Sequence, residues 1–220
     1  MGDDLACEAV ARALGAAGVG HLRLIRRTGA LPLAVAQAMS ASNPELQIAT
    51  WPWPRARSGA ASVDDPADRR SPWLDAIAGA AVVVRAGFDD DPMLRAAVQM
   101  AVPVVAMRGR EDGIDVISFR RHGPCPHLSL DIPAGPETPS EDGAPAIVAA
   151  HIAAAEALAL IAEATAGDAR ARLIRIPAPG VSDGGSAAPG GAGWAVRSTD
   201  IPWAPECFAC GGSGVEMSFA

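Results

Sequence analysis

The 220-residue chain contains no lysine and no tyrosine, so all 18 of its basic residues are arginines. Without lysine it cannot form a Schiff base through an amine side chain or use the lysine of a phosphate-binding loop. Half of the residues are hydrophobic, which is enough for a sizeable core. The length fits one domain, or one domain with an appendage.

Long basic and long apolar runs are also missing. The net charge is −7, and the densest basic clusters are pairs such as Arg26-Arg27 and Arg120-Arg121, so we expect no nucleic-acid surface. No run reaches about 18 uninterrupted apolar residues, so we expect no membrane span. The first residues are acidic instead of basic, so we expect no secretory leader. Four cysteines suggest no disulfide framework, and we therefore expect a cytoplasmic protein.

The last thirty residues contain a cysteine knuckle. Cys207 and Cys210 are three apart, with Pro205 before them and two glycines after them. Such a turn can direct both sulfurs to one metal ion, but a closed zinc site needs four ligands. Cys125 lies in another Pro/Gly turn between His122 and His127, and Cys125, Cys207, Cys210 and one of these histidines can complete the site. A reduced knuckle or a reversible disulfide is the alternative.

Strand and helix patterns alternate along the chain, which predicts a doubly wound α/β sheet with a mixed antiparallel edge. The expected strands cover residues 21–26, 46–51, 80–85, 102–107, 114–119, 173–176 and 194–198. The expected helices cover residues 4–17, 31–42, 72–78, 92–100 and 144–166. Residues 1–176 are predicted to form the α/β domain, 177–193 a flexible Gly/Pro/Ser linker, and 194–220 a strand with the cysteine knuckle packed on the same domain.

This order of elements resembles the ubiquitin-activating, ThiF-type adenylyltransferase superfamily. The similarity covers nearly the full chain, and its segments are Gly15 to Ile25, Ala38 to Pro44, Ala80 to Asp91, Val102 to Cys125 and the cysteine tail. The resemblance implies a Rossmann-like, mostly parallel sheet. It also implies that the family's first strand, which leads into a glycine-rich turn, is missing before Gly2.

The resemblance places the remains of a nucleotide site at four positions. Gly2 lies at the phosphate turn, where Asp3 and Asp4 would repel phosphate and instead favour a helix N-terminus. Arg26 stands where the family has a ribose-binding acid. Asp89, or its neighbours Asp90 and Asp91, could replace the magnesium-binding acid only by a register shift. Arg85, at the end of the apolar strand, is expected at the carboxyl edge of the sheet, where ligands of such folds bind.

These departures predict a dismantled ATP site beside a retained scaffold. The family's first zinc knuckle is also incomplete, because Leu128 takes the place of its second cysteine, and residues 131–145 contain no catalytic cysteine. The pattern resembles the ThiF-like partner proteins of azoline-forming, YcaO-dependent peptide modification. We therefore expect a non-catalytic partner with structural zinc and without ATP or magnesium.

The resemblance also implies partners. It implies a homodimer, or a heterodimer with a catalytic subunit, and a precursor peptide or a carrier protein as the bound substrate. The Ala-rich helix at 144–166 offers small side chains for close helix approach, which favours a dimer. The alternative function is an ATP-dependent adenylyltransferase that activates a carrier-protein or peptide carboxylate.

Overall fold

The computed structural model of the chain describes residues 2–26, 31–53, 72–86, 92–110, 113–120, 143–163, 171–177 and 196–201. The helices are α1 (Gly2–Ala16), α2 (Leu33–Ser42), α3 (Pro72–Ile77), α4 (Pro92–Gln99) and α6 (Gly143–Ala162). The strands are β1 (His21–Arg26), β2 (Gln47–Pro52), β3 (Val83–Ala86), β4 (Val104–Arg110), β5 (Gly113–Phe119), β6 (Arg172–Pro177) and β7 (Arg197–Asp200).

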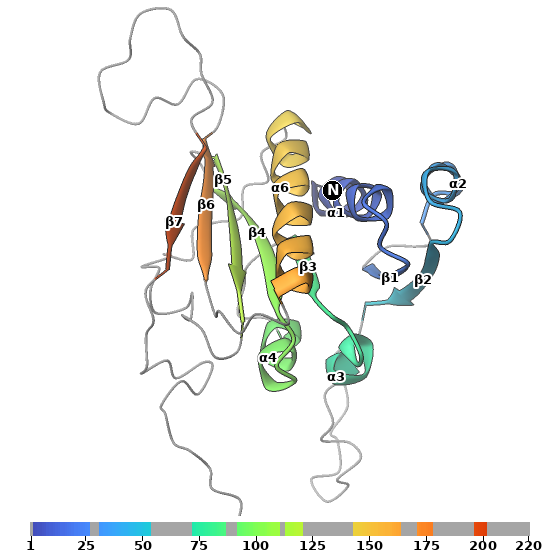
Figure 1. The fold of residues 1–220 in the computed structure, drawn as a ribbon, viewed down its shortest axis with the longest axis horizontal. Helices are drawn as coiled ribbons and strands as arrows, with labels where there is room; N and C mark the ends of the chain where they lie inside the picture. Colours follow the sequence, from blue (N-terminus) through green and yellow to red (C-terminus); the bar gives the residue numbers. More distant parts are fainter. Residues whose placement is uncertain are drawn as a thin grey trace, which may run out of the picture.

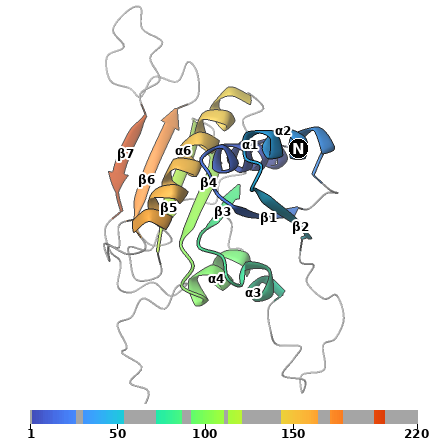
Figure 2. The ribbon, with the colours of Figure 1, turned by 45° about the vertical axis from the view of Figure 1, so that its right-hand side comes forward.

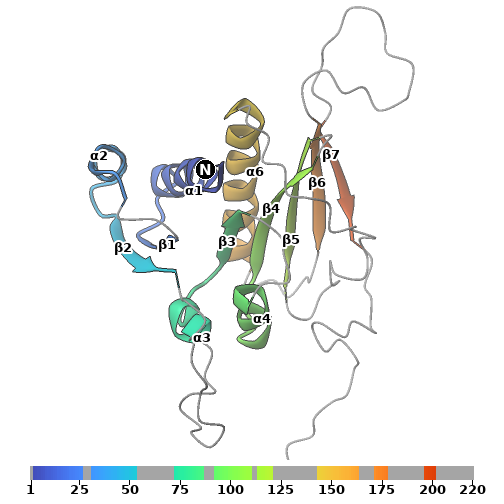
Figure 3. The ribbon, with the colours of Figure 1, turned by 180° about the vertical axis from the view of Figure 1, so that it is seen from behind.

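The strands form two sheets. β1 and β2 are parallel and make a two-stranded sheet, whereas β3 to β7 make a five-stranded sheet in sequence order. Only β3 and β4 are parallel in the larger sheet, and its other neighbours are antiparallel. Figures 1 and 3 show β1 and β2 set apart from β3, with α1 nearby.

The mixed α/β fold is therefore confirmed, but the described strands are not mostly parallel. The strands β4 and β5 are separated in sequence by two residues. A connection this short can join only antiparallel neighbours, because a parallel pair needs a crossover of a dozen residues or more. The antiparallel part thus begins at the second strand of the five-stranded sheet instead of at its edge.

Helices pack on both faces of strands β3 to β5 in the five-stranded sheet, whereas β7 is exposed. Val105 and Met107 of β4 pack with α1 and α6, while Val104 and Ala106 pack with α3 and α4 on the opposite face. This alternation follows the two-residue period of a strand. The strand β5 is buried along its whole length, as expected for a central strand between two helical layers. Figure 2 shows α6 lying across the sheet.

Two helices end in the same hydrogen-bonded motif. After α1, the N–H of Val19 donates to the carbonyl of Leu14 and that of Gly18 to Gly15, with Gly18 at φ 92°. After α4, the N–H groups of Val102 and Ala101 bond in the same pattern, with Ala101 at φ 59°. This Schellman motif requires a left-handed residue, which glycine adopts freely and alanine does not.

The helix α6 is long and apolar enough, by length and composition, to cross a membrane. Its small residues are buried inside the protein instead, against α1 and the sheet: Ala149, Ala150, Ala153, Ala154 and Ala157. This burial is typical of the core helix of a folded protein. It also removes the reason for predicting a dimer through these alanines, because they are already in contact with α1 and the sheet.

One carboxylate ties α6 to the sheet. Glu156 accepts a hydrogen bond from the Ser118 hydroxyl at 2.7 Å and one from Arg172 at 2.8 Å. Ser118 and Arg172 are register partners on β5 and β6, so one acid on the helix contacts two strands. Arg120, just after β5, donates to the carbonyl of Leu160 at 2.7 Å and so caps the end of α6.

Candidate functional site

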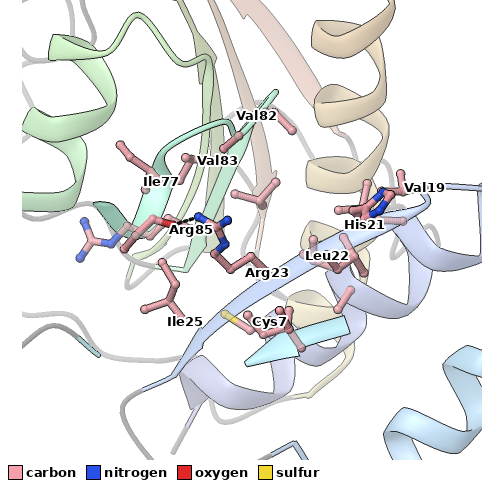
Figure 4. A pocket seen from close by; sticks show the side chains of 18 of the residues that line it. Cys7, Val19, His21, Leu22, Arg23, Ile25, Ile77, Val82, Val83 and Arg85 are labelled. Carbon is pink, nitrogen blue, oxygen red and sulfur yellow. Dashed lines mark hydrogen bonds between the residues drawn. The ribbon is translucent and has the colours of Figure 1, made fainter. Parts of the chain in front are cut away.

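A cavity of about 750 Å³ lies between β1 and β3, where the two sheets face each other. Residues from α1, β1, α3 and β3 form its walls (Figure 4). This volume falls within the range of small-ligand sites in proteins, roughly 300 to 1,000 Å³. The cavity is therefore the candidate functional site of the described residues.

Apolar side chains cover most of the cavity, and they come from two helical layers. Val10 and Leu14 of α1 lie on one side, packed with Leu22 of β1. Ile77 of α3 lies on the other side, in the cluster against which Ile25 of β1 packs. Leu22 and Leu24 of β1 thus pack with clusters that include α1, and Ile25 packs with the cluster that includes α3, as the period of a strand requires.

Arg23 joins β1 to α3 at the wall of the cavity. Its guanidinium donates to the carbonyl of Ala76 at 2.7 Å and to that of Ala78 at 3.3 Å. It also lies over the ring of Trp51 on β2, with its central carbon 4.8 Å from the ring centroid, which is a cation–π contact. This side chain therefore connects the two-stranded sheet to α3, the helix that packs against β3.

Arg85 lies near the carboxyl end of β3 and lines the same cavity (Figure 4). It is buried, with 6% of its surface exposed. The exposed thiol of Cys7 and the carboxylate of Glu8 line the cavity from α1. Among the described residues, the charged groups of the cavity wall are thus two guanidinium groups and one carboxylate.

Of the predicted site residues that the structure describes, Arg85 is the one that lines the cavity. Arg85 was expected at the carboxyl edge of the sheet, and the structure has it there, in the cavity wall. Gly2 begins α1 and Arg26 ends β1, but the structure describes the surroundings of neither residue. Asp89 and the predicted zinc ligands Cys125, His127, Cys207 and Cys210 lie outside the described residues.

Sequence reasoning missed Arg23 and Cys7. The alternation of His21 and Arg23 with Leu22 and Leu24 could have indicated that one face of β1 is open to polar contacts. Cys7 gave no such signal, because a single cysteine on an Ala-rich helix is usually a small core residue. Among the described residues, no three His, Cys, Asp or Glu side chains lie close enough together to hold a metal ion.

The fold and cavity define a mixed α/β protein of Rossmann-like type. Its fold is similar to two solved structures of E. coli MccB. MccB with AMPCPP and MccA matches at a TM-score of 0.53 and 14% identity, over 94% of this chain and 64% of that one. MccB with MccA-N7isoASN matches at a TM-score of 0.50 and 14% identity, over 93% of this chain and 63% of that one.

The chain thus spans less than two thirds of the MccB chain that it matches. At this identity the likeness concerns the fold alone. No protein-family model and no curated protein matches the chain in sequence.

Proposed function

We propose that this chain is a non-catalytic, ThiF-like partner protein in the biosynthesis of a ribosomal peptide natural product of the azoline type. In this role it holds a precursor peptide or a carrier protein for a catalytic subunit and does not itself activate a carboxylate with ATP. The fold likeness to MccB, which was solved with MccA, supports a partner of this kind.

The chemistry of the cavity wall is the observation that carries the proposal. Adenylate transfer needs a metal ion and hydrogen-bond donors arranged around the phosphates. Magnesium prefers carboxylate oxygens, and among the residues that the structure describes Glu8 supplies the one carboxylate in the wall. The remaining surface is largely apolar, which suits a peptide side chain better than a hydrated triphosphate with its metal ion.

The sequence supports the same proposal. The acidic pair Asp3-Asp4 follows the first glycine of α1, and no lysine exists in the chain to contact phosphate. We further propose a structural zinc ion bound by Cys125, Cys207, Cys210 and His127, since the Cys-x-x-Cys spacing and the Pro/Gly turns suit a tetrahedral site. A homodimer or a heterodimer with the catalytic subunit, in the cytoplasm, completes the proposal.

Calorimetric titration with ATP and magnesium tests the proposed function. We expect no heat of binding at micromolar protein, with or without a candidate precursor peptide. Binding in the micromolar range that requires magnesium would contradict the proposal. The matched control is Arg85→Met, because a real nucleotide site at the end of β3 should lose affinity when this guanidinium is removed, whereas nonspecific binding to the acidic chain should not.

One observation favours the alternative, an ATP-dependent adenylyltransferase. Arg85 is buried at the carboxyl end of β3 and lines the cavity, and anionic ligands of open α/β sheets bind at this edge. Under this alternative the guanidinium contacts a phosphate or a carboxylate of the substrate. The same titration distinguishes the two functions.

A further inference from the structure

A row of charged residues crosses the five-stranded sheet at one level. Asp115 of β5 is the register partner of Arg108 on β4 and of Arg175 on β6, and Arg175 is the partner of Arg197 on β7. Side chains of directly paired residues lie on the same face of a sheet, so these four share one face. Arg110 is two residues beyond Arg108 on β4 and belongs to that face too. These five residues are here called the arginine row.

The arginine row continues a face of the sheet that is apolar in its other part. Ala106, Ile117 and Leu173 are each two residues away from a member of the row, on β4, β5 and β6. All three are buried in the cluster that also contains residues of α3 and α4. Figure 1 shows the strands β4 to β7 side by side. The face thus changes from a buried apolar surface to a charged one within two residues of each strand.

Asp115 holds two of the arginines in place. Its carboxylate accepts a hydrogen bond from Nη1 of Arg110 at 3.3 Å and one from Nε of Arg175 at 3.2 Å. The side chain of the acid is 4% exposed, whereas those of Arg110 and Arg175 are 31% and 43% exposed. A guanidinium carries five N–H donors. The buried acid therefore orients two donor groups that solvent, and so a ligand, can reach.

The arginine row is a local excess of positive charge. Its four guanidinium groups and one carboxylate give these five residues a net charge of +3, in a chain whose net charge is −7. Arg175 and the exposed Arg197 lie directly opposite each other, and like charges in such positions repel. An anion between these two arginines would offset the repulsion, as Asp115 does for Arg110 and Arg175.

We propose that the arginine row binds an acidic peptide segment in an extended conformation, with carboxylates at alternate positions. The row crosses four strands, which is a width of about 14 Å at the normal strand spacing of about 4.8 Å. One phosphate or carboxylate group is much smaller than this width, whereas about four residues of extended chain match it. Alternate side chains of such a chain point to the same side, so its carboxylates face the guanidinium groups together.

Charge selects this face of the protein for an acidic segment. The acidic chain as a whole repels such a peptide, and the arginine row attracts it locally. Arginine also pairs with carboxylates through two parallel hydrogen bonds, which adds geometric specificity. The inference deepens the proposed function, on which it rests for the origin of the peptide.

Fluorescence anisotropy of a labelled acidic octapeptide tests the inference in the full chain. The probe has four Ser-Glu repeats, and its matched control has four Ser-Gln repeats. The chain should bind the acidic octapeptide at least tenfold more tightly than the neutral one. The difference should shrink as the NaCl concentration rises from about 50 mM to about 500 mM, because salt screens exposed charges.

Two arginines of β6 provide a matched pair of variants. The side chains of Arg175 and Arg172 are 43% and 37% exposed, and each binds a buried acid that keeps a second donor. Arg172 is the register partner of Ser118 and so lies on the opposite face. Arg175→Gln should weaken binding of the acidic octapeptide about threefold to fivefold, whereas Arg172→Gln, with the same loss of charge, should leave it unchanged.

The exposed strand β7 provides a second variant. Arg197→Gln should also weaken binding about threefold to fivefold, and it keeps the test decisive if Arg175→Gln does not fold. Removing both arginines should weaken binding about tenfold. Circular dichroism of each variant shows whether its fold is intact.

Three results would overturn the inference. The two octapeptides could bind equally, or Arg172→Gln could weaken binding as much as Arg175→Gln. Inorganic phosphate could also displace the acidic octapeptide at an equal concentration, which would indicate a site for a single anion. A precursor peptide that binds the chain and its Arg175→Gln and Arg197→Gln variants equally would refute this site and leave the proposed function standing. Magnesium-dependent ATP binding would contradict the proposed function alone.

Discussion

Replacing Glu156 by alanine should loosen α6 from the sheet. The carboxylate accepts hydrogen bonds from Ser118 and Arg172, and its own side chain is only 12% exposed. In the variant, the Ser118 hydroxyl stays buried, with 3% of that residue exposed, and loses its acceptor. The arginine side chain is 37% exposed and can turn to water instead.

The expected loss of stability follows from these exposures. A buried hydroxyl without its charged acceptor costs about 1 to 3 kcal/mol. The half-exposed ion pair adds about 0.5 kcal/mol, and the better helix propensity of alanine returns up to about 0.4 kcal/mol. The free energy of unfolding should therefore fall by about 2 kcal/mol, which corresponds to a decrease in Tm of about 4 to 8 °C for a chain of this size.

Urea unfolding followed by circular dichroism measures this loss. Glu156→Gln keeps two hydrogen-bonding positions and should lose about 0.5 kcal/mol, because only the charge is removed. The matched control is Glu163→Ala near the end of α6, where the pair with Arg120 is 3.9 Å long and the acid is 46% exposed, so a change below about 0.5 kcal/mol is expected. If Glu156→Ala were as stable as this control, the account of how α6 is held on the sheet would be wrong.

Three further predictions concern the fold and the metal. Ala101→Gly should raise the free energy of unfolding by about 1 kcal/mol in urea titrations, because Ala101 has φ 59° and glycine adopts this conformation without strain; no gain would contradict this account of how α4 ends. Ala153→Leu should cost about 1 to 3 kcal/mol by overpacking a fully buried site, whereas the exposed Ala155→Leu should be nearly neutral in the same titration. Elemental analysis should find about one zinc per chain, chelation should lower the Tm, and protein purified without chelator that contains no zinc would exclude the site.

The sequence predicts most elements of this fold, because their signals are local. The alternating pattern of β1 and the glycine at position 18, which ends α1, predict bounds for these two elements that are close to the observed ones. β3 begins at Val83, three residues later than expected. A turn precedes it, in which Gly79 has φ 74° and the N–H of Ala80 donates to the carbonyl of Ile77. The start of β4 is also late, since Val102 still bonds to Ala97 of α4.

The candidate site is less predictable, because it depends on a gap between strands distant in sequence. Arg85 was expected at a strand end from the order of elements, and the structure agrees on this position. The bonds of Arg23 to α3 span more than fifty residues of sequence, and no local pattern contains that information. The division into two sheets was not foreseen either, because strand order is set by the tertiary packing of α1 over both β1 and β3.

Exchange of radiolabelled pyrophosphate into ATP tests the central claim most directly. The purified full chain, with magnesium and with candidate precursor or carrier peptides, should give no exchange above a protein-free blank, because removing even one group that stabilises the transition state typically lowers a rate by about a hundredfold or more. Exchange that depends on both magnesium and a peptide, and that is lost in Arg85→Met, would contradict the account and establish the adenylyltransferase instead.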